Sequence, residues 1–366
     1  MTDIHLSVRI AGQDAGNLVS QVEVEESDQS ADLATLTFHD RSLALPDILH
    51  EGLPVEIDLG SRGAHALLFR GTITSVRCGF ARLGAARVVV EALDGLAGLA
   101  LVPRTRRWWN TTLGGVIREI ALAHGMPPGR VALVEDPVFD ADRPLQQVEE
   151  TDLALLHRLA GAYDCKVWVD HSGPRDRLAF VATRTLLADP PIDQQLVHNL
   201  NVLDLETTFD AFATDPARRL VTTDADTGDR IEARETSVTA ADTGWVPDRV
   251  RLTALGKGGS EWAAAVLLAG APVRAGLTER WRTRERPAGA ASRPASDPAL
   301  VPGDRARLRG QTASGRAAGS VLLQPRRRVG LSGFGGRWSG DWYLARVRHE
   351  VDVAARSYTT AFTARR

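Results

Sequence analysis

The first hundred residues contain six short segments in which apolar and polar residues alternate. Alternation of this kind places the apolar side chains on one face of a β-strand. The segments are IHLSVRI (4–10), QVEVEE (21–26), LATLTF (33–38), PVEIDL (54–59), LLFRGTITSVRC (67–78) and ARVVVEAL (86–93). Turn-forming stretches such as AGQDAG and GSRG separate them. The pattern predicts that residues 1–102 form a small β-barrel.

After Pro103 the apolar period changes to that of a helix. Leucine, valine, isoleucine and alanine recur from Leu113 to Ala121, after a polar stretch at 110–112 that offers side-chain caps. A second helix is predicted after a cap at Thr151 or Asp152, with an apolar stripe of Leu153, Leu156, Leu159 and Tyr163. We therefore assign residues 103–162 to a helical connecting region.

The remainder of the chain again reads mainly as strands. CKVWVD (165–170) and RLAFVA (177–182) predict a hairpin, and NVLDLETTF (201–209) and RRLVTTDADTGDRIEARE (218–235) predict further strands. Residues 163–250 are thus expected to be the β-rich part of a second barrel. Residues 251–310 are expected to hold a helix from Ser260 and a linker rich in Ala, Pro, Ser and Arg, whose composition extends over 285–320. Residues 311–366 are expected to be the closing strands of the second barrel.

The two ends of the chain share an order of features. PVEIDLG, LLFRGTITSVR and GAARVVVEAL can be laid beside RRVGLSGFG, GRWSGDWYLARVR and VAARSYTTAFTA. Both series contain a glycine, then a Val-Arg pair, then a strand introduced by Ala-Ala-Arg. Gly71 to Val76 spans five steps and Gly340 to Val347 spans seven, a difference that preserves strand parity. The comparison predicts two related β-barrels in a mainly β (α+β) chain.

Composition excludes several classes of protein. The net charge of -2 over 366 residues gives no general attraction to nucleic acid or to an acidic membrane. No apolar run approaches the roughly 18 residues that span a bilayer, and the N-terminus lacks the features of a signal peptide. We therefore expect no specific nucleic-acid binding, no membrane insertion, and a chain that is made and folds in the cytoplasm. Cys78 and Cys165 form no CxxC motif and are expected to be buried thiols.

A search for catalytic frameworks finds no GxSxG elbow, HExxH helix, phosphate loop or dinucleotide fingerprint. No catalytic, cofactor-binding or metal residue is therefore assigned. The sharpest enzyme hypothesis takes Cys165 as nucleophile, His157 or His171 as base, and Asp152 or Asp170 as the group that orients the base. Carboxylate pairs such as Glu149 with Glu150, or Asp224 with Asp226, have the residue types for glycoside cleavage but are typical of exposed turns.

Two arginine-rich runs have alternative interpretations. RTRRWW (104–109) combines charge with aromatic rings that can stack on bases, or it is a linker whose tryptophans cover the join between lobes. The near-neutral net charge favours an interface within the protein. The same interpretation applies to Arg326, Arg327 and Arg328.

Two long motifs resemble a known family. ETDLALLHRLAGAYDCKVWVD followed by RLAFVA is similar to the helix-then-hairpin signature of phage late control protein D and VgrG-type hub proteins. RVGLSGFGGRWSGDWYLARVRHEVDVAARSYTTAFTARR resembles the closing motif of that family, and NTTLGGVIREIALAHGM resembles its upstream helix. The chain departs from the pattern at Asp164, where the family usually has glycine.

The resemblance implies a structural baseplate hub of a contractile injection system or phage tail. It implies a homotrimer whose six barrels adapt a sixfold inner tube to a threefold spike around a central channel. Expected partners are inner tube proteins, a separate spike protein, baseplate wedge proteins, and cargo or a tape-measure protein in the channel, without cofactors. A cell-wall-degrading tail enzyme and a β-rich receptor-binding module remain as alternatives, and the kind of machine stays open.

Overall fold

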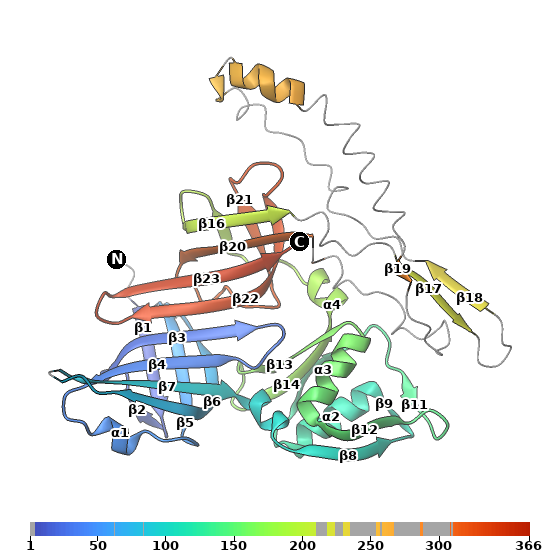
Figure 1. Ribbon diagram of the computed structural model, residues 1–366, viewed down its shortest axis with the longest axis horizontal. Helices are drawn as coiled ribbons and strands as arrows, with labels where there is room; N and C mark the ends of the chain where they lie inside the picture. The colour runs from blue at the N-terminus through green and yellow to red at the C-terminus, as the bar shows by residue number, and fades with distance from the viewer. Residues whose placement is uncertain are drawn as a thin grey trace.

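The computed structural model is mainly β, as the sequence predicts (Figure 1). It describes residues 4–61, 63–82, 84–209, 218–223, 230–234, 254–256, 258–266, 286–287, 308 and 310–366. A sheet of 13 strands runs through the protein, and a lobe of helices and small sheets packs beside it. No helix among these residues is long and apolar enough to cross a membrane.

The first half of the large sheet, which we call the first β-domain (residues 4–94), confirms all six strands predicted there. Its elements are β1 (Ile4–Ile10), β2 (Gln13–Asp14), β3 (Val19–Ser27), β4 (Leu33–Asp40), a short helix α1 (Leu45–Ile48), β5 (Pro54–Ser61), β6 (Ala64–Gly79) and β7 (Ala86–Asp94). The spatial order β3-β4-β7-β6-β5-β1 curls around one apolar core that includes Val24, Leu36, Ile57, Phe69 and Val90. Alternating burial along β7 shows why these residues form strands.

The second half, the second β-domain (residues 195–209 and 311–366), repeats that topology. Its strands are β15 (Gln195–Val197), β16 (Val202–Phe209), β20 (Gln311–Ala318), β21 (Arg328–Ser332), β22 (Gly340–Asp352) and β23 (Ser357–Arg365). Their spatial order β16-β20-β23-β22-β21-β15 matches the first domain strand for strand. One difference in pairing is that β15 runs parallel to β21, whereas β1 is antiparallel to β5.

A β-bulge at the same place supports this equivalence. The register of β6 on β7 shifts between Ile73 and Ser75, and that of β22 on β23 shifts between Leu344 and Arg346. In both strands the Val-Arg pair begins two residues after the bulged position. Val76 then faces Val90, and Val347 faces Phe362. The equivalence predicted from the Val-Arg pairs is therefore confirmed.

The Ala-Ala-Arg triplets are not equivalent in the pairing. Val90 lies three residues after Arg87, whereas Phe362 lies six residues after Arg356. The triplets precede each strand but do not determine its register. Register follows from the buried face of the strand rather than from its entry residues.

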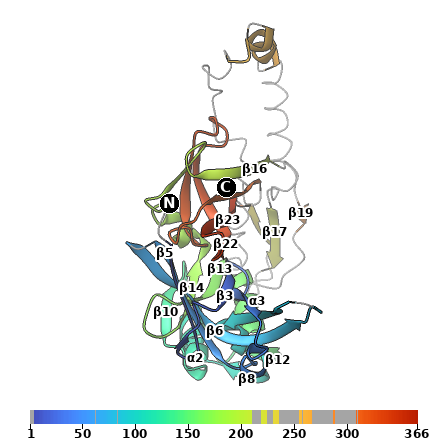
Figure 2. The ribbon, with the colours of Figure 1, turned by 90° about the vertical axis from the view of Figure 1, so that its left-hand side faces the viewer.

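The two β-domains are joined more directly than the sequence suggested. One edge of β22 pairs with β3, from Arg346 opposite Ser27 to Asp352 opposite Gln21, so that both domains share one sheet (Figures 1 and 2). Because β22 occupies the outer edge of β3, the strand order in the first domain does not close from β3 back to β1. Each domain is accordingly a partly open barrel, and helical segments are not the only connection between them.

Residues 95–188 form a separate α/β lobe. It contains a 3-10 turn η1 (Gly95–Ala100), β8 (Pro103–Trp108), β9 (Thr111–Thr112), α2 (Leu113–Ala123), β10 (Pro128–Ala132), β11 (Val138–Phe139), β12 (Leu145–Thr151), α3 (Asp152–Ala162), β13 (Cys165–Asp170), β14 (Arg177–Ala182) and α4 (Thr183–Ala188). Both predicted helices are confirmed. Thr112 Oγ1 accepts from Gly115 N at 3.1 Å, and Thr151 Oγ1 accepts from Ala154 N at 3.2 Å.

The predicted β13–β14 hairpin belongs to this lobe and not to the second barrel. β14 pairs with β10, and the hairpin packs Val167 and Phe180 into one core with Ile117 of α2 and Leu156 of α3. The expected boundary at residue 162 is therefore corrected to the end of α4. The sequence also missed β8 and β12, whose antiparallel pairing makes part of the supposed helical region a sheet.

Asp164 shows why glycine is usual at its position. Its φ is +50°, in the left-handed region that aspartate tolerates better than most residues. The Asp164 carbonyl accepts from Thr183 N at 2.8 Å, and its Oδ1 accepts from Thr183 Oγ1 at 3.1 Å. These bonds hold the turn from α3 into β13.

The region between β16 and β20 is described only in part. β17 (Arg218–Thr223) and β18 (Arg230–Arg234) are strands, as the sequence predicts. They pair with each other and with β19 (Arg286–Pro287) in a small sheet of their own, and so are not part of the second barrel as expected. Residues 258–266 are helical, which agrees with the helix predicted from Ser260. Strand β20 at 311–318 agrees with the expectation that residues 311–366 are closing strands, although its composition resembles that of the preceding linker. Its small residues permit close strand approach: a Cβ at Gly315 would lie 2.3 Å from the Asp204 carbonyl oxygen.

Candidate functional site

A polar cavity of about 450 Å³ lies where the first β-domain, the α/β lobe and the second β-domain meet. Its walls come from the end of β3, the start of β6, the β13–β14 hairpin, and the segment that precedes β21. Glu26, Leu68, Trp168, His171, Asp189 and Arg326 are among the lining residues. Because three parts of the chain form it, this junction decides how they are held relative to one another.

A buried ion pair lies beside the cavity. Lys166 Nζ in β13 lies 2.5 Å from Asp28 Oδ2 in the turn after β3, and both side chains are 3% exposed. Tyr343 Oη of β22 donates to the same carboxylate oxygen at 3.1 Å. Asp28 N also donates to the Ala345 carbonyl at 3.0 Å. One aspartate thus connects all three parts of the protein.

Arg326 makes a second connection across the junction. Its Nη1 donates to the Ser27 carbonyl at 2.6 Å, and its guanidinium lies over the Trp168 ring at 5.0 Å. Arg328 Nη1 donates to the carbonyls of Leu187 and Asp189 at 3.2 and 3.3 Å. The interface interpretation of this basic run is therefore confirmed for these two arginines.

The run 104–109 has a different place from the one expected. It forms strand β8 inside the α/β lobe and is not a linker at the join between lobes. Arg106 Nη2 donates to Asp152 Oδ1, and Trp108 Nε1 donates to Glu119 at 3.0 Å. Trp109 is 54% exposed.

Asp152 in the signature helix is a structural anchor. Burial by itself raises its pKa, but hydrogen bonds from His124 and Gln147, with the charges of Arg106 and Arg104, outweigh burial and lower the pKa. His124 Nε2 lies 2.8 Å from Asp152 Oδ2. This carboxylate therefore ties α3 to α2, β8 and β12.

The residues of the cysteine-enzyme hypothesis do not meet at one site. Cys165 is buried in the lobe core, where its thiol donates to the Tyr163 carbonyl at 3.2 Å. His157 lies on the exposed face of α3. His171 follows the far end of β13, about 20 Å from Cys165 at the usual strand rise of about 3.3 Å per residue. Asp170 bonds Ser172 N and Arg177 instead.

Of the carboxylate pairs considered for glycoside cleavage, Glu149 and Glu150 make contacts that support the fold. Glu150 accepts from Arg158 Nη2 at 2.8 Å, and Glu149 N donates to Thr105 Oγ1 at 3.2 Å. Asp224 and Asp226 lie outside the described residues.

The structure brings together one cluster of ligand-type residues that no motif indicates. One carboxylate oxygen each of Asp32 and Asp94 and one ring nitrogen of His171 lie within 4.8 Å of one another, and all three residues are buried. Burial raises the pKa of Asp32 well above its ordinary value and that of Asp94 to about 6. These residues are far apart in the chain, so no spacing in the sequence could have indicated them.

Comparisons with known proteins were consistent with this architecture. A family model described as the phage tail baseplate hub (GPD) matches residues 30–354. A 43 kDa tail protein of prophage MuSo2 from Shewanella oneidensis is 13% identical with a TM-score of 0.66, covering 99% of this chain and 98% of that one. A tail protein from Neisseria meningitidis MC58 is 14% identical with a TM-score of 0.63, covering 100% and 97%.

An Escherichia coli protein described as a type VI secretion component similar to T4 bacteriophage tail proteins is also alike in structure. It is 15% identical with a TM-score of 0.56, and the match covers 98% of this chain and 76% of that one. At these identities the likeness establishes the fold. No curated protein sequence gave a significant match.

Proposed function

This chain belongs to the phage tail baseplate hub family, and we propose on that premise that three copies form a ring joining a sixfold inner tube to a threefold spike. The ring surrounds a channel for cargo or a tape-measure protein, and baseplate wedge proteins bind its outside. It assembles in the bacterial cytoplasm and acts mechanically, not as an enzyme.

The observation that carries this proposal is the repeated topology of the two β-domains. Three chains with two equivalent domains each present six similar units, which is what a match to a sixfold tube requires. The repeat is a property of strand order and bulge position and does not depend on sequence similarity between the halves.

The repeat also predicts how neighbouring copies pair. Within one chain, β22 pairs with the outer edge of β3. The equivalent of β22 is β6, and the equivalent of β3 is β16, which ends the large sheet among the described strands. The later residues of β6 pair with β7 on one side, whereas its pairing with β5 on the other side stops at Thr72. In a ring, β6 of one copy therefore pairs with β16 of the next.

Register transferred from β22–β3 gives specific neighbours. Arg348 faces Glu25 and Val351 faces Val22 within the chain. The equivalent pairs across the ring are Arg77 with Thr208 and Phe80 with Leu205. Phe80 is 66% exposed in the single chain, and pairing would bury it.

An ion pair is repeated in the same way. Arg348 Nη1 lies 3.5 Å from Glu23 Oε1 across the β22–β3 junction. The equivalents are Arg77, whose side chain is 69% exposed, and Glu206, which is also exposed. We therefore expect Arg77 of one copy to contact Glu206 of the next.

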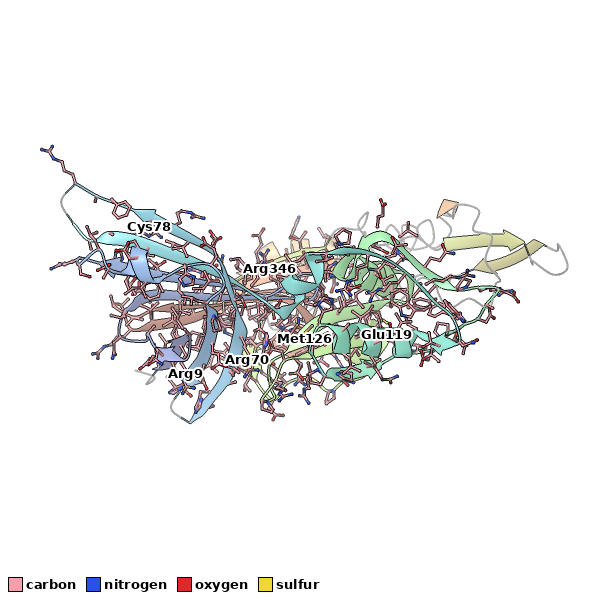
Figure 3. All side chains as sticks on the ribbon, turned by 90° about the horizontal axis from the view of Figure 1, so that it is seen from below. Arg9, Arg70, Cys78, Glu119, Met126 and Arg346 are labelled. Carbon is pink, nitrogen blue, oxygen red and sulfur yellow. The ribbon has the colours of Figure 1, made fainter. Side chains whose placement is uncertain are left out.

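Charge reversal tests this ring. We expect the purified chain to have the mass of a trimer by light scattering, and Arg77→Glu or Glu206→Arg alone to shift it towards monomer because like charges then face each other. The double variant should restore the trimer. Arg9→Glu on β1, labelled in Figure 3, is the matched control and should leave the trimer intact.

A chain that remains monomeric and never joins tube or spike proteins would contradict the hub proposal. If the trimer forms equally well in both single charge variants and in the double variant, only the proposed β6–β16 pairing is wrong.

Incubation of the protein with peptidoglycan should release no fragments. Release that is lost in Cys165→Ala would support the tail-enzyme alternative.

A further inference from the structure

We propose that Asp32, Asp94 and His171 bind one divalent transition-metal ion of the zinc type at the junction between the first β-domain and the α/β lobe. This inference is independent of the hub function. The two carboxylates come from the turn before β4 and the end of β7, and the imidazole follows β13. An ion there would fasten the α/β lobe to the first β-domain.

Each of the three side chains has one polar atom bonded to the protein and a second that is buried without a hydrogen-bond partner. The unpartnered atoms are Asp32 Oδ2, Asp94 Oδ2 and His171 Nε2. Buried polar atoms without partners are uncommon in native proteins and call for an explanation. Three of them in residues whose ligand atoms lie within 4.8 Å of one another are explained together by a shared ion.

The carboxylates are held in place by the backbone. Asp32 Oδ1 accepts from Ser27 N at 3.0 Å, and Asp94 Oδ1 caps η1 by accepting from Leu96 N at 3.0 Å. Asp94 N also donates to the Asp32 carbonyl at 3.1 Å. Because both carboxylates are fixed by short local bonds, their second oxygens are positioned before any ion arrives.

The imidazole has the support that metal-binding histidines usually have. His171 Nδ1 lies 2.9 Å from Asp176 Oδ1, and the same carboxylate oxygen is 2.9 Å from Arg70 Nη1. Figure 3 shows Arg70 at the boundary between the first β-domain and the α/β lobe. A carboxylate on Nδ1 favours the tautomer that carries the proton there and leaves the Nε2 lone pair for a metal.

The charges around the site favour a cation. Glu26 adds negative charge near Asp32, and Arg326, which opposes it, is already engaged by the Ser27 carbonyl and the Trp168 ring. Two carboxylates ionised in a buried site are costly unless they are neutralised. A divalent ion neutralises both.

The ligand types select the class of ion. One imidazole nitrogen with two carboxylate oxygens suits zinc and similar transition ions, which are stable with four ligands. Calcium and magnesium need six or more oxygen ligands or several bound waters. His171 also lines the 450 Å³ cavity, so the cavity reaches one of the three proposed ligands.

Titration of the metal-stripped full chain with Zn²⁺ tests the site. By calorimetry, we expect one tight site that raises the melting temperature. Asp94→Asn and His171→Gln should abolish this site, while Asp176→Asn, which only positions the imidazole, should weaken it about 10- to 100-fold. Mg²⁺ should not compete at equal concentration.

A second histidine cluster supplies the control. His5, Asp58 and His65 also lie close together, but at the surface. His65→Gln should keep the tight site and lose at most weak binding. Tight binding that persists in Asp94→Asn, or disappears in His65→Gln, would overturn the proposal.

Zn²⁺ titration of the unmodified protein tests the proposal without any variant. If Zn²⁺ neither binds nor raises its melting temperature, the proposal is wrong even where the variants fail to fold.

Discussion

Lys166→Met is expected to lower the free energy of unfolding by about 3–5 kcal/mol, because it leaves the buried carboxylate of Asp28 without its cation. Both side chains are almost fully buried, and the Tyr343 hydroxyl alone cannot neutralise the charge. The midpoint of urea denaturation, followed by tryptophan fluorescence, measures the loss. Since Asp28 connects all three parts of the protein, ring assembly should fail as well.

Two further variants make this result interpretable. Adding Asp28→Asn to Lys166→Met removes the orphaned charge and should recover part of the stability. Arg130→Met breaks an ion pair with Asp189 that is partly exposed, and should cost only about 0–1 kcal/mol. Equal losses in Lys166→Met and Arg130→Met would show that the buried pair has no special role.

Leu156→Asp is expected to prevent folding of the α/β lobe. Leu156 is fully buried on α3, in the core shared with α2 and the β13–β14 hairpin. An aspartate there combines a lost apolar contact with an unpaired buried charge, and the total exceeds the about 2–5 kcal/mol of a leucine-to-alanine change. Soluble yield and circular dichroism measure the outcome.

The neighbouring residue provides the control for this variant. His157 lies on the exposed face of α3, so His157→Ala should fold and assemble normally. A folded Leu156→Asp together with a defective His157→Ala would reverse the assignment of the helix faces. It would also support the hypothesis that the signature helix is part of an active site.

The local elements could be predicted from sequence because their causes are local. Alternation placed the six strands of the first β-domain within a few residues of their ends. Capping residues predicted the helix starts at 110–112 and 151–152, where Thr112 and Thr151 make the caps. The strands β8 and β12 were missed because RTRRWW and QQVEE are rich in charged and polar side chains. The residues of β8 are held by strand β12 and by Asp152, which lie far from β8 in sequence.

The junction was beyond sequence reasoning for the same physical reason. Arg326 was recognised as an interface residue from composition, but its contact with Trp168 depends on how the lobes pack. Asp28 with Lys166, and Asp32 with Asp94 and His171, meet only after β3, β7 and β13 have been placed. No spacing of residues in the sequence indicates these contacts.

The sequence by itself determined the strands, the capped helices, the repeat of the Val-Arg pairs and the resemblance to hub proteins, because periodicity and capping act over a few residues. Only the tertiary structure decided that β22 pairs with β3, that the β13–β14 hairpin packs with the helices, and that buried charges gather at the junction. Those outcomes depend on which apolar faces pack against one another, and on which charged residues from distant parts of the chain become partners when both are buried.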